Sequence, residues 1–113
     1  MNKIEETIRT KFNFLKKFYD ETWDKSGHTL HIGLFKNKKD TLNKAYKQAT
    51  EYLVSTASDI KPFDKNSTVL DIGCGTGRTI IEICAKFDCQ GTGIDLSDEQ
   101  IKDAREYLEK LLK

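Results

Sequence analysis

The stretch Val69-Leu70-Asp71-Ile72-Gly73-Cys74-Gly75-Thr76-Gly77 decides the fold expected of this 113-residue chain. Val69, Leu70 and Ile72 form a short apolar run, typical of a parallel β-strand covered on both faces. Three alternate glycines follow, where we expect the backbone to bend tightly and to approach a ligand closely. Residues 79–87 then place apolar side chains at spacings of three and four, which predicts a helix whose N-terminus is directed at the glycine loop.

A second strand is predicted over residues 90–96, with an acid near its end. Asp95 lies about twenty residues beyond the glycines, the spacing at which a carboxylate reaches the two ribose hydroxyls of a nucleotide cofactor. Ser97 and Gln100 predict a capping box at the start of another helix, with Ser97 as N-cap and the Gln100 side chain reaching back to it. The order strand, loop, helix, strand and helix predicts an α/β fold.

The glycine spacing distinguishes between cofactors. A dinucleotide-binding Gly-x-Gly-x-x-Gly motif would need a third glycine at Arg78 or at Ile80, and neither residue is glycine. The pattern Asp-x-Gly-x-Gly-x-Gly that begins at Asp71 instead resembles motif I of the class I S-adenosylmethionine-dependent methyltransferases. S-adenosylmethionine has no pyrophosphate, so its site needs close backbone approach and a carboxylate for the ammonium group more than a phosphate cradle.

This resemblance implies a Rossmann-like fold and a set of cofactor-binding residues. The strand-end acid Asp71 and the glycine loop would hold the methionyl end of S-adenosylmethionine, and Asp95 would bind the ribose. Within the loop, we interpret Cys74 as a small residue that fills space and not as a reactive thiol. The cofactor-binding residues predicted from the motif and the second strand end are Asp71, Gly73, Cys74, Gly75, Gly77, Asp95 and Leu96.

An upstream pair of segments, residues 18–23 and 30–35, resembles small-molecule methyltransferases of the sarcosine/dimethylglycine and tocopherol types. This resemblance adds Trp23 to the predicted cofactor-binding residues, because an aromatic ring can face a sulfonium. Tyr19 and His31 are the weak candidates for groups near the methyl acceptor, and a structural role for either stays open. Residues 24–30 depart from the shorter, double-glycine link of the amine methyltransferases, so the acceptor cannot be carried over.

The first half of the chain is predicted to form a helical lid. Apolar residues recur at spacings of three and four from Ile4 to Trp23, and again over residues 41–53, where Asp40 is a plausible N-cap. Residues 58–66, which include Pro62, read as a linker. We therefore predict a lid over residues 1–60 and, over residues 61–113, the first half of a cofactor-binding core.

Composition restricts the partners. Nineteen basic and eighteen acidic residues give a net charge of +1, without the basic excess of a nucleic-acid-binding surface. No apolar run approaches membrane-spanning length, so no membrane partner is expected. The three cysteines form no disulfide framework, which favours a cytoplasmic location, and neither they nor the two histidines have metal-site spacing.

The working hypothesis is methyl transfer from S-adenosylmethionine to a small-molecule acceptor such as an amine. We expect the remaining strands and the acceptor-binding loops to lie beyond Lys113, so that this part alone is inactive and either self-associates or needs a complementary half. Two alternatives stay open: a non-catalytic interaction module that retains the fold, and a nicotinamide-dependent oxidoreductase, which the glycine spacing disfavours.

Overall fold

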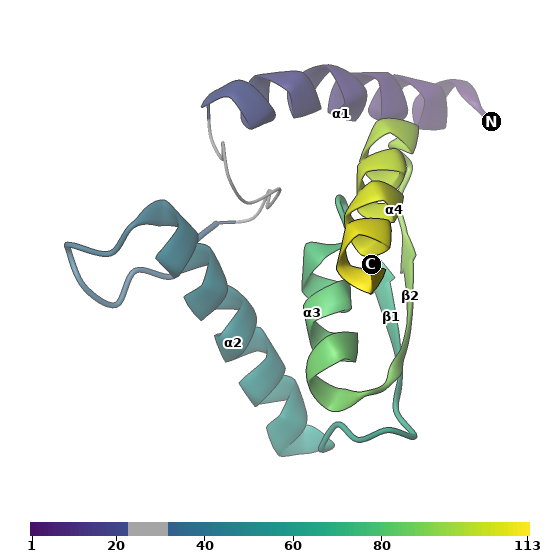
Figure 1. Ribbon diagram of the computed structural model, residues 1–113. Coiled ribbons are helices and arrows are strands. Elements are labelled where there is room, and N and C mark those ends of the chain that lie inside the picture. The colour runs from purple at the N-terminus through teal and green to yellow at the C-terminus, as the bar shows by residue number, and fades with distance from the viewer. Residues whose placement is uncertain (23–31) are drawn as a thin grey trace.

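The computed structural model describes residues 1–22 and 32–113 (Figure 1). Trp23, His28 and His31 lie outside this part of the chain. The described elements are α1 (Lys3–Thr22), α2 (Leu42–Ile60), β1 (Thr68–Ile72), α3 (Arg78–Phe87), β2 (Gln90–Ile94) and α4 (Asp98–Leu112). Among these helices, none combines the length and the apolar character needed to cross a bilayer.

The predicted strand, loop, helix and strand unit is confirmed. β1 and β2 are parallel and hydrogen-bonded, with Val69 opposite Gly91 and Ile72 opposite Ile94. α3 packs on one face of this pair and buries Ile80 and Ile83. A Cβ at Gly91 would collide with the side chains of Ile80 and Cys84 on α3, so the lack of a side chain at this position of β2 lets the helix lie close to the strands.

The apolar run of β1 is typical of a strand covered on both faces, but the described residues cover only one face. Leu70 is 59% exposed, Ile72 76% and Ile94 49%. Side chains alternate along a strand, so these residues point away from the face on which α3 packs. No described residue pairs with the second edge of β1, and this apolar face is therefore open.

α4 begins as predicted, but only half of the predicted capping box forms. The Ser97 hydroxyl accepts a hydrogen bond from the Gln100 backbone N–H at 3.2 Å, which confirms Ser97 as N-cap. The Gln100 side chain does not reach back. Instead the Ser97 N–H donates to Asp95 Oδ1 at 2.8 Å, because this nearer carboxylate occupies the position that the glutamine would need.

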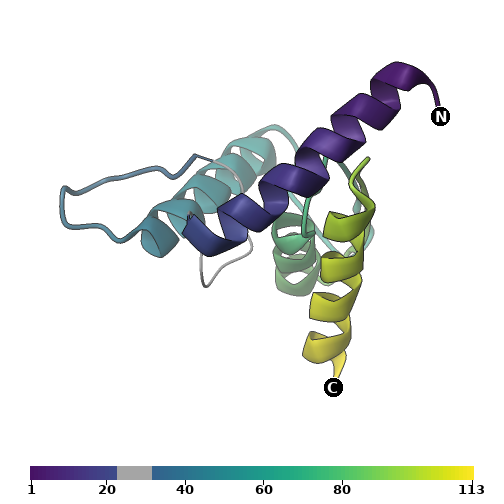
Figure 2. The same ribbon diagram turned by 90° about the horizontal axis from the view of Figure 1, so that it is seen from above.

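α1 is the predicted amphipathic helix, but its apolar stripe is not buried: Ile4 is 71% exposed and Phe12 44%. The helix crosses the start of α4 (Figures 1 and 2) and is attached there by polar side chains. Lys16 forms ion pairs with Asp103, at 2.7 Å, and with Asp20. Burial alone would lower the pKa of Lys16, but the two carboxylates raise it above its usual value.

α2 is longer than predicted and has a different N-cap. Thr41 accepts the hydrogen bond from the Lys44 N–H at 3.3 Å, whereas Asp40 binds further back, accepting from the backbone N–H groups of Lys36 and Asn37. Asp40 also forms an ion pair with Lys44 at 2.8 Å. Asp40 therefore accepts backbone hydrogen bonds in the preceding turn and contacts α2 through side chains, but it does not cap the backbone N–H groups of the helix.

The buried side of α2 also differs in detail from the prediction. Ala45 and Tyr46 are buried as expected, but Leu53 is 60% exposed and Val54 is buried in its place. The helix continues through residues 58–60, which were predicted as linker, and ends at Ile60. The two turn-forming residues Ser58 and Asp59 do not break the helix, which Val54 anchors one turn earlier.

Candidate functional site

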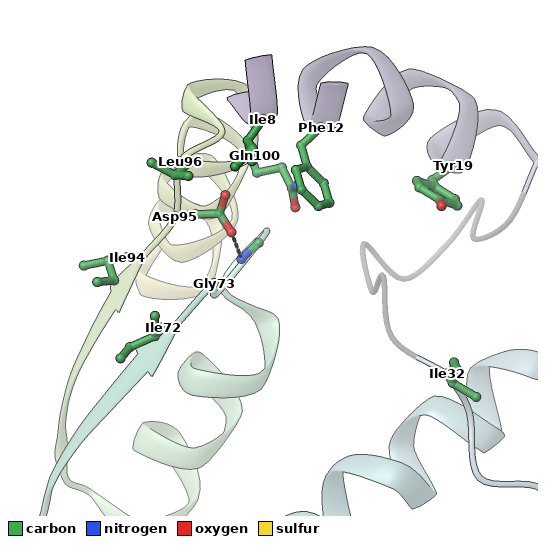
Figure 3. A pocket seen from close by; sticks show the side chains of 11 residues that line it. Ile8, Phe12, Tyr19, Ile32, Ile72, Gly73, Ile94, Asp95, Leu96 and Gln100 are labelled. Atoms are coloured by element: carbon green, nitrogen blue, oxygen red, sulfur yellow. Dashed lines mark hydrogen bonds between the residues drawn. The ribbon is translucent and has the colours of Figure 1, made fainter. Parts of the chain in front are cut away.

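A cavity of about 760 Å³ lies between α1, the carboxyl ends of β1 and β2, and the start of α4 (Figure 3). This end of a parallel sheet is where α/β proteins bind ligands. The wall is mostly apolar. It is formed by Ile8, Phe12, Tyr19, Ile32, Ile72, Gly73, Gly75, Ile94, Asp95, Leu96 and Gln100.

The glycine loop between β1 and α3 has the backbone geometry that its sequence predicts. Gly73, Gly75 and Gly77 all have positive φ angles, of 79°, 55° and 72°. A Cβ at Gly75 would lie 2.7 Å from the side-chain oxygen of Gln100, and one at Gly77 would lie 3.1 Å from the Cβ of Ala104. Side chains at these positions would therefore be strained and would push against α4.

The backbone N–H groups of this loop are already used inside the protein. Gly73 N and Cys74 N both donate to the carbonyl oxygen of Ile94, at 2.8 and 3.0 Å, and Gly75 N donates to Asp95 Oδ2 at 2.8 Å. A phosphate-binding loop instead directs such N–H groups at its ligand. The loop is therefore poorly suited to the pyrophosphate of a dinucleotide.

Asp95 joins the glycine loop to α4 and also faces the cavity (Figure 3). One carboxylate oxygen accepts from Gly75 N and the other from Ser97 N, each at 2.8 Å. Each oxygen of an ionised carboxylate can accept a further hydrogen bond. The same side chain can thus brace the loop and bind hydroxyl donors in the cavity.

Asp71 lies on β1 opposite Gly93 and is not part of the cavity wall. Burial raises its pKa above the usual value, and the negative charge of Asp95 raises it further. Two carboxylates close enough to interact in this way favour a cation nearby. The predicted contact between Asp71 and a cofactor stays a prediction.

Cys74 also lies outside the cavity wall, and its surroundings suit the predicted space-filling role. Burial raises the pKa of its thiol, and the charges of Asp71 and Asp95 act in the same direction. A thiol with a raised pKa stays protonated and is a poor nucleophile.

Gln100 is a site residue that the sequence pattern assigned only to helix capping. It is 3% exposed and lines the cavity, and its Oε1 has no hydrogen-bond partner among the described residues. A buried carbonyl without a donor is costly, so this oxygen suits a ligand that donates a hydrogen bond. Gln100 lies in the first turn of α4, five residues after Asp95, and this short distance from the predicted ribose-binding acid is the signal that could have indicated it.

The lid contributes to the far wall of the cavity. Tyr19 and Ile32 lie across the cavity from Asp95 and Leu96, and Ile8 and Phe12 of α1 lie above the loop (Figure 3). Trp23 and His31, which were also predicted near the site, are outside the described residues. Over residues 1–22 and 32–113 no group of three or more His, Cys, Asp or Glu side chains could hold a metal ion.

Comparison with known proteins agrees with this geometry. The chain is 30% identical over 99 residues to a sterol 24-C-methyltransferase of Debaryomyces hansenii, a match that covers 88% of this chain and 24% of the relative. The chain thus spans about a quarter of the length of the sterol 24-C-methyltransferases that it matches.

Solved methyltransferase-type structures share the fold. A protein described as a sarcosine dimethylglycine methyltransferase from Galdieria sulphuraria superposes with a TM-score of 0.76 at 23% identity, covering 88% of this chain and 38% of the other. The mycolic acid cyclopropane synthase CmaA1, solved with SAH and CTAB, gives 0.79 at 20% identity, covering 96% and 36%. The predicted Rossmann-like fold is confirmed.

The sequence model of one family matches residues 1–112, which is nearly all of the chain. The chain therefore belongs to the mycolic acid cyclopropane synthetase family, whose members share the class I S-adenosylmethionine-dependent methyltransferase fold.

Proposed function

We propose that this chain forms the S-adenosylmethionine-binding part of a methyltransferase that acts on a small-molecule acceptor. The observation that carries the proposal is the polar end of the cavity, where the Asp95 carboxylate and the orphaned Gln100 Oε1 face the cavity beside a loop whose own N–H groups are satisfied. The relatives named above and the structure solved with SAH support the same assignment.

The residues present fit the chemistry of this cofactor. Asp95 and Gln100 both offer acceptor oxygens, which match the two hydroxyl donors of a ribose. The carboxylates of Asp71 and Asp95 favour the cationic ammonium and sulfonium groups. A phosphate-bearing cofactor would meet two negative charges and no free loop N–H group at Gly73, Cys74 or Gly75.

When bound, S-adenosylmethionine supplies a methyl group on a sulfonium, which is an electrophile that needs no further activation. The residues of this chain would bind and orient the cofactor and exclude water. Ile8, Phe12 and Leu96 present apolar surface to the cavity, and a dry cavity protects the sulfonium from hydrolysis. Positioning of donor and acceptor would then provide most of the rate enhancement.

Calorimetric titration of the 113-residue chain with S-adenosylhomocysteine and, separately, with NADH tests the proposal. We expect S-adenosylhomocysteine to bind and NADH not to bind. Binding of NADH alone would favour the oxidoreductase alternative, and binding of neither would favour a non-catalytic interaction module. The amine acceptor stays a prediction. A radiolabelled methyl-transfer assay over amines, hydroxyl compounds and alkenes decides it in a sample that also contains the remaining strands and the acceptor-binding loops.

A further inference from the structure

Asn13 of α1 contacts the first residues of α4 through both ends of its side-chain amide. The Ser97 hydroxyl donates to Asn13 Oδ1 at 2.5 Å, and Asn13 Nδ2 donates to Asp98 Oδ1 at 2.9 Å. Ser97 is fully buried, so water does not compete for its hydroxyl. One lid side chain thus bridges the N-cap of α4 and the residue that follows it.

This contact continues into the cofactor cavity. The Ser97 N–H donates to Asp95 Oδ1, and Asp95 Oδ2 accepts from Gly75 N, each at 2.8 Å. An unbroken set of hydrogen bonds therefore leads from α1 through the cap of α4 to the glycine loop. Any shift of α1 acts on the residue that orients the Asp95 carboxylate.

Asn13 also determines where the apolar lid residues lie. Phe12 precedes it in sequence and points into the cavity, with Ile8 one turn earlier on the same wall (Figure 3). The apolar stripe of α1 is largely exposed, so it does not fix the helix by itself. The polar contacts of Asn13, together with the Lys16–Asp103 ion pair one turn later, attach α1 to the core.

We propose that Asn13 is a positioning residue that couples closure of the α1 lid to retention of the cofactor beside Asp95. The inference rests on the proposed function and adds a residue that carries no chemistry itself. Loss of the Asn13 contacts frees Phe12 and Ile8 from the cavity mouth, so the bound cofactor dissociates faster. The N-cap of α4 persists, because Ser97 still accepts from the Gln100 N–H.

A side-chain swap tests the coupling. Asn13→Asp places a carboxylate against Asp98, whereas the double variant Asn13→Asp with Asp98→Asn rebuilds the bond with donor and acceptor exchanged. In Asn13→Asp we expect S-adenosylhomocysteine to bind about tenfold more weakly, mainly through faster dissociation. We expect the double variant to recover most of this loss. Asp98→Asn alone controls for the lost helix-end charge.

Asn43→Asp, which adds the same charge at an exposed position of α2, is the matched control and is expected to bind like the parent. Amide hydrogen exchange of α1, measured on the same variants, reports lid docking independently of binding. Exchange in α1 should rise in Asn13→Asp and fall again in the double variant.

The outcomes separate the two proposals. If the parent chain binds no S-adenosylhomocysteine, the proposed function fails, and the coupling fails with it. Suppose that the parent and Asn13→Asp bind S-adenosylhomocysteine equally well, while α1 of the variant loses its protection from amide hydrogen exchange. The lid is then not coupled to the cofactor. Weakened binding that the double variant does not restore would also overturn the assignment, because the effect would not arise from this hydrogen bond.

Discussion

Replacement of Asp95 by alanine should affect both folding and cofactor binding, because the carboxylate has two roles. It accepts backbone hydrogen bonds from Gly75 and Ser97, both at 2.8 Å. A hydrogen bond to a charged acceptor contributes about 1.5–3 kcal/mol, and the side chain is only half-buried, so water replaces part of each bond. We expect Asp95→Ala to lower the free energy of unfolding by about 2–3 kcal/mol.

Asp95→Ala should also lower the affinity for S-adenosylhomocysteine directly, and not only by unfolding part of the protein. Loss of the ribose acceptor predicts at least about a tenfold weaker complex, equivalent to about 1.4 kcal/mol, when variant and parent are compared under conditions where both are folded. Urea unfolding measures the stability, and calorimetry below the unfolding transition measures the affinity.

Asp59→Ala, at the exposed end of α2, removes the same charge far from the cavity and serves as the control. Unchanged affinity in a folded Asp95→Ala variant would refute the ribose-binding role. Unchanged stability would refute the bracing of the glycine loop.

Three further predictions concern the loop, the lid and the open sheet face. Gly75→Val places a branched side chain at a φ of 55° and against Gln100. Binding of S-adenosylhomocysteine should therefore be lost, while circular dichroism shows that the helices persist. Normal binding would contradict the role of this glycine. The ion pair with Lys44 and the hydrogen bond from Gln48 hold the pKa of Asp40 well below its usual range, so its contribution to stability should be present at neutral pH and be lost as the pH falls below about 4. Asp40→Asn should therefore be less stable than the parent at pH 7 in thermal melts, and a difference that does not narrow in acid would argue against it. The 113-residue chain should self-associate at micromolar concentration, because the edge of β1 is unpaired among the described residues and the side chains beside it, Leu70, Ile72 and Ile94, are exposed. Ile72→Lys should weaken this self-association. Light scattering that shows a stable monomer would disprove the expectation.

Much of the fold could be read from local patterns. The run from Val69 to Gly77 predicted β1 and the loop, and residues 79–87 predicted α3, because apolar periodicity and glycine spacing are properties of neighbouring residues. Ser97 was identified as an N-cap for the same reason. The prediction failed where two local partners compete: Asp95 and Gln100 could both bind the Ser97 N–H, and only the folded backbone shows that Asp95 does.

The sequence by itself determined that this chain has a glycine loop between the first strand and the helix that follows it, and an acid at the end of the second strand. It also disfavoured a dinucleotide cofactor, since the third glycine of that motif is missing. These features depend on residues close together in the chain, whose spacing is the same before and after folding.

Tertiary structure alone decided how α1 is attached and what completes the cavity. The apolar stripe of α1 predicted burial, yet the helix docks through the polar residues Asn13 and Lys16. The sequence pattern could not predict this docking, because the partners Ser97, Asp98 and Asp103 lie more than eighty residues away in the chain. The orphaned oxygen of Gln100 likewise appears only when α4 packs beside Gly75. Contacts between distant residues depend on the packing of whole elements, and no local spacing encodes which polar groups will then meet.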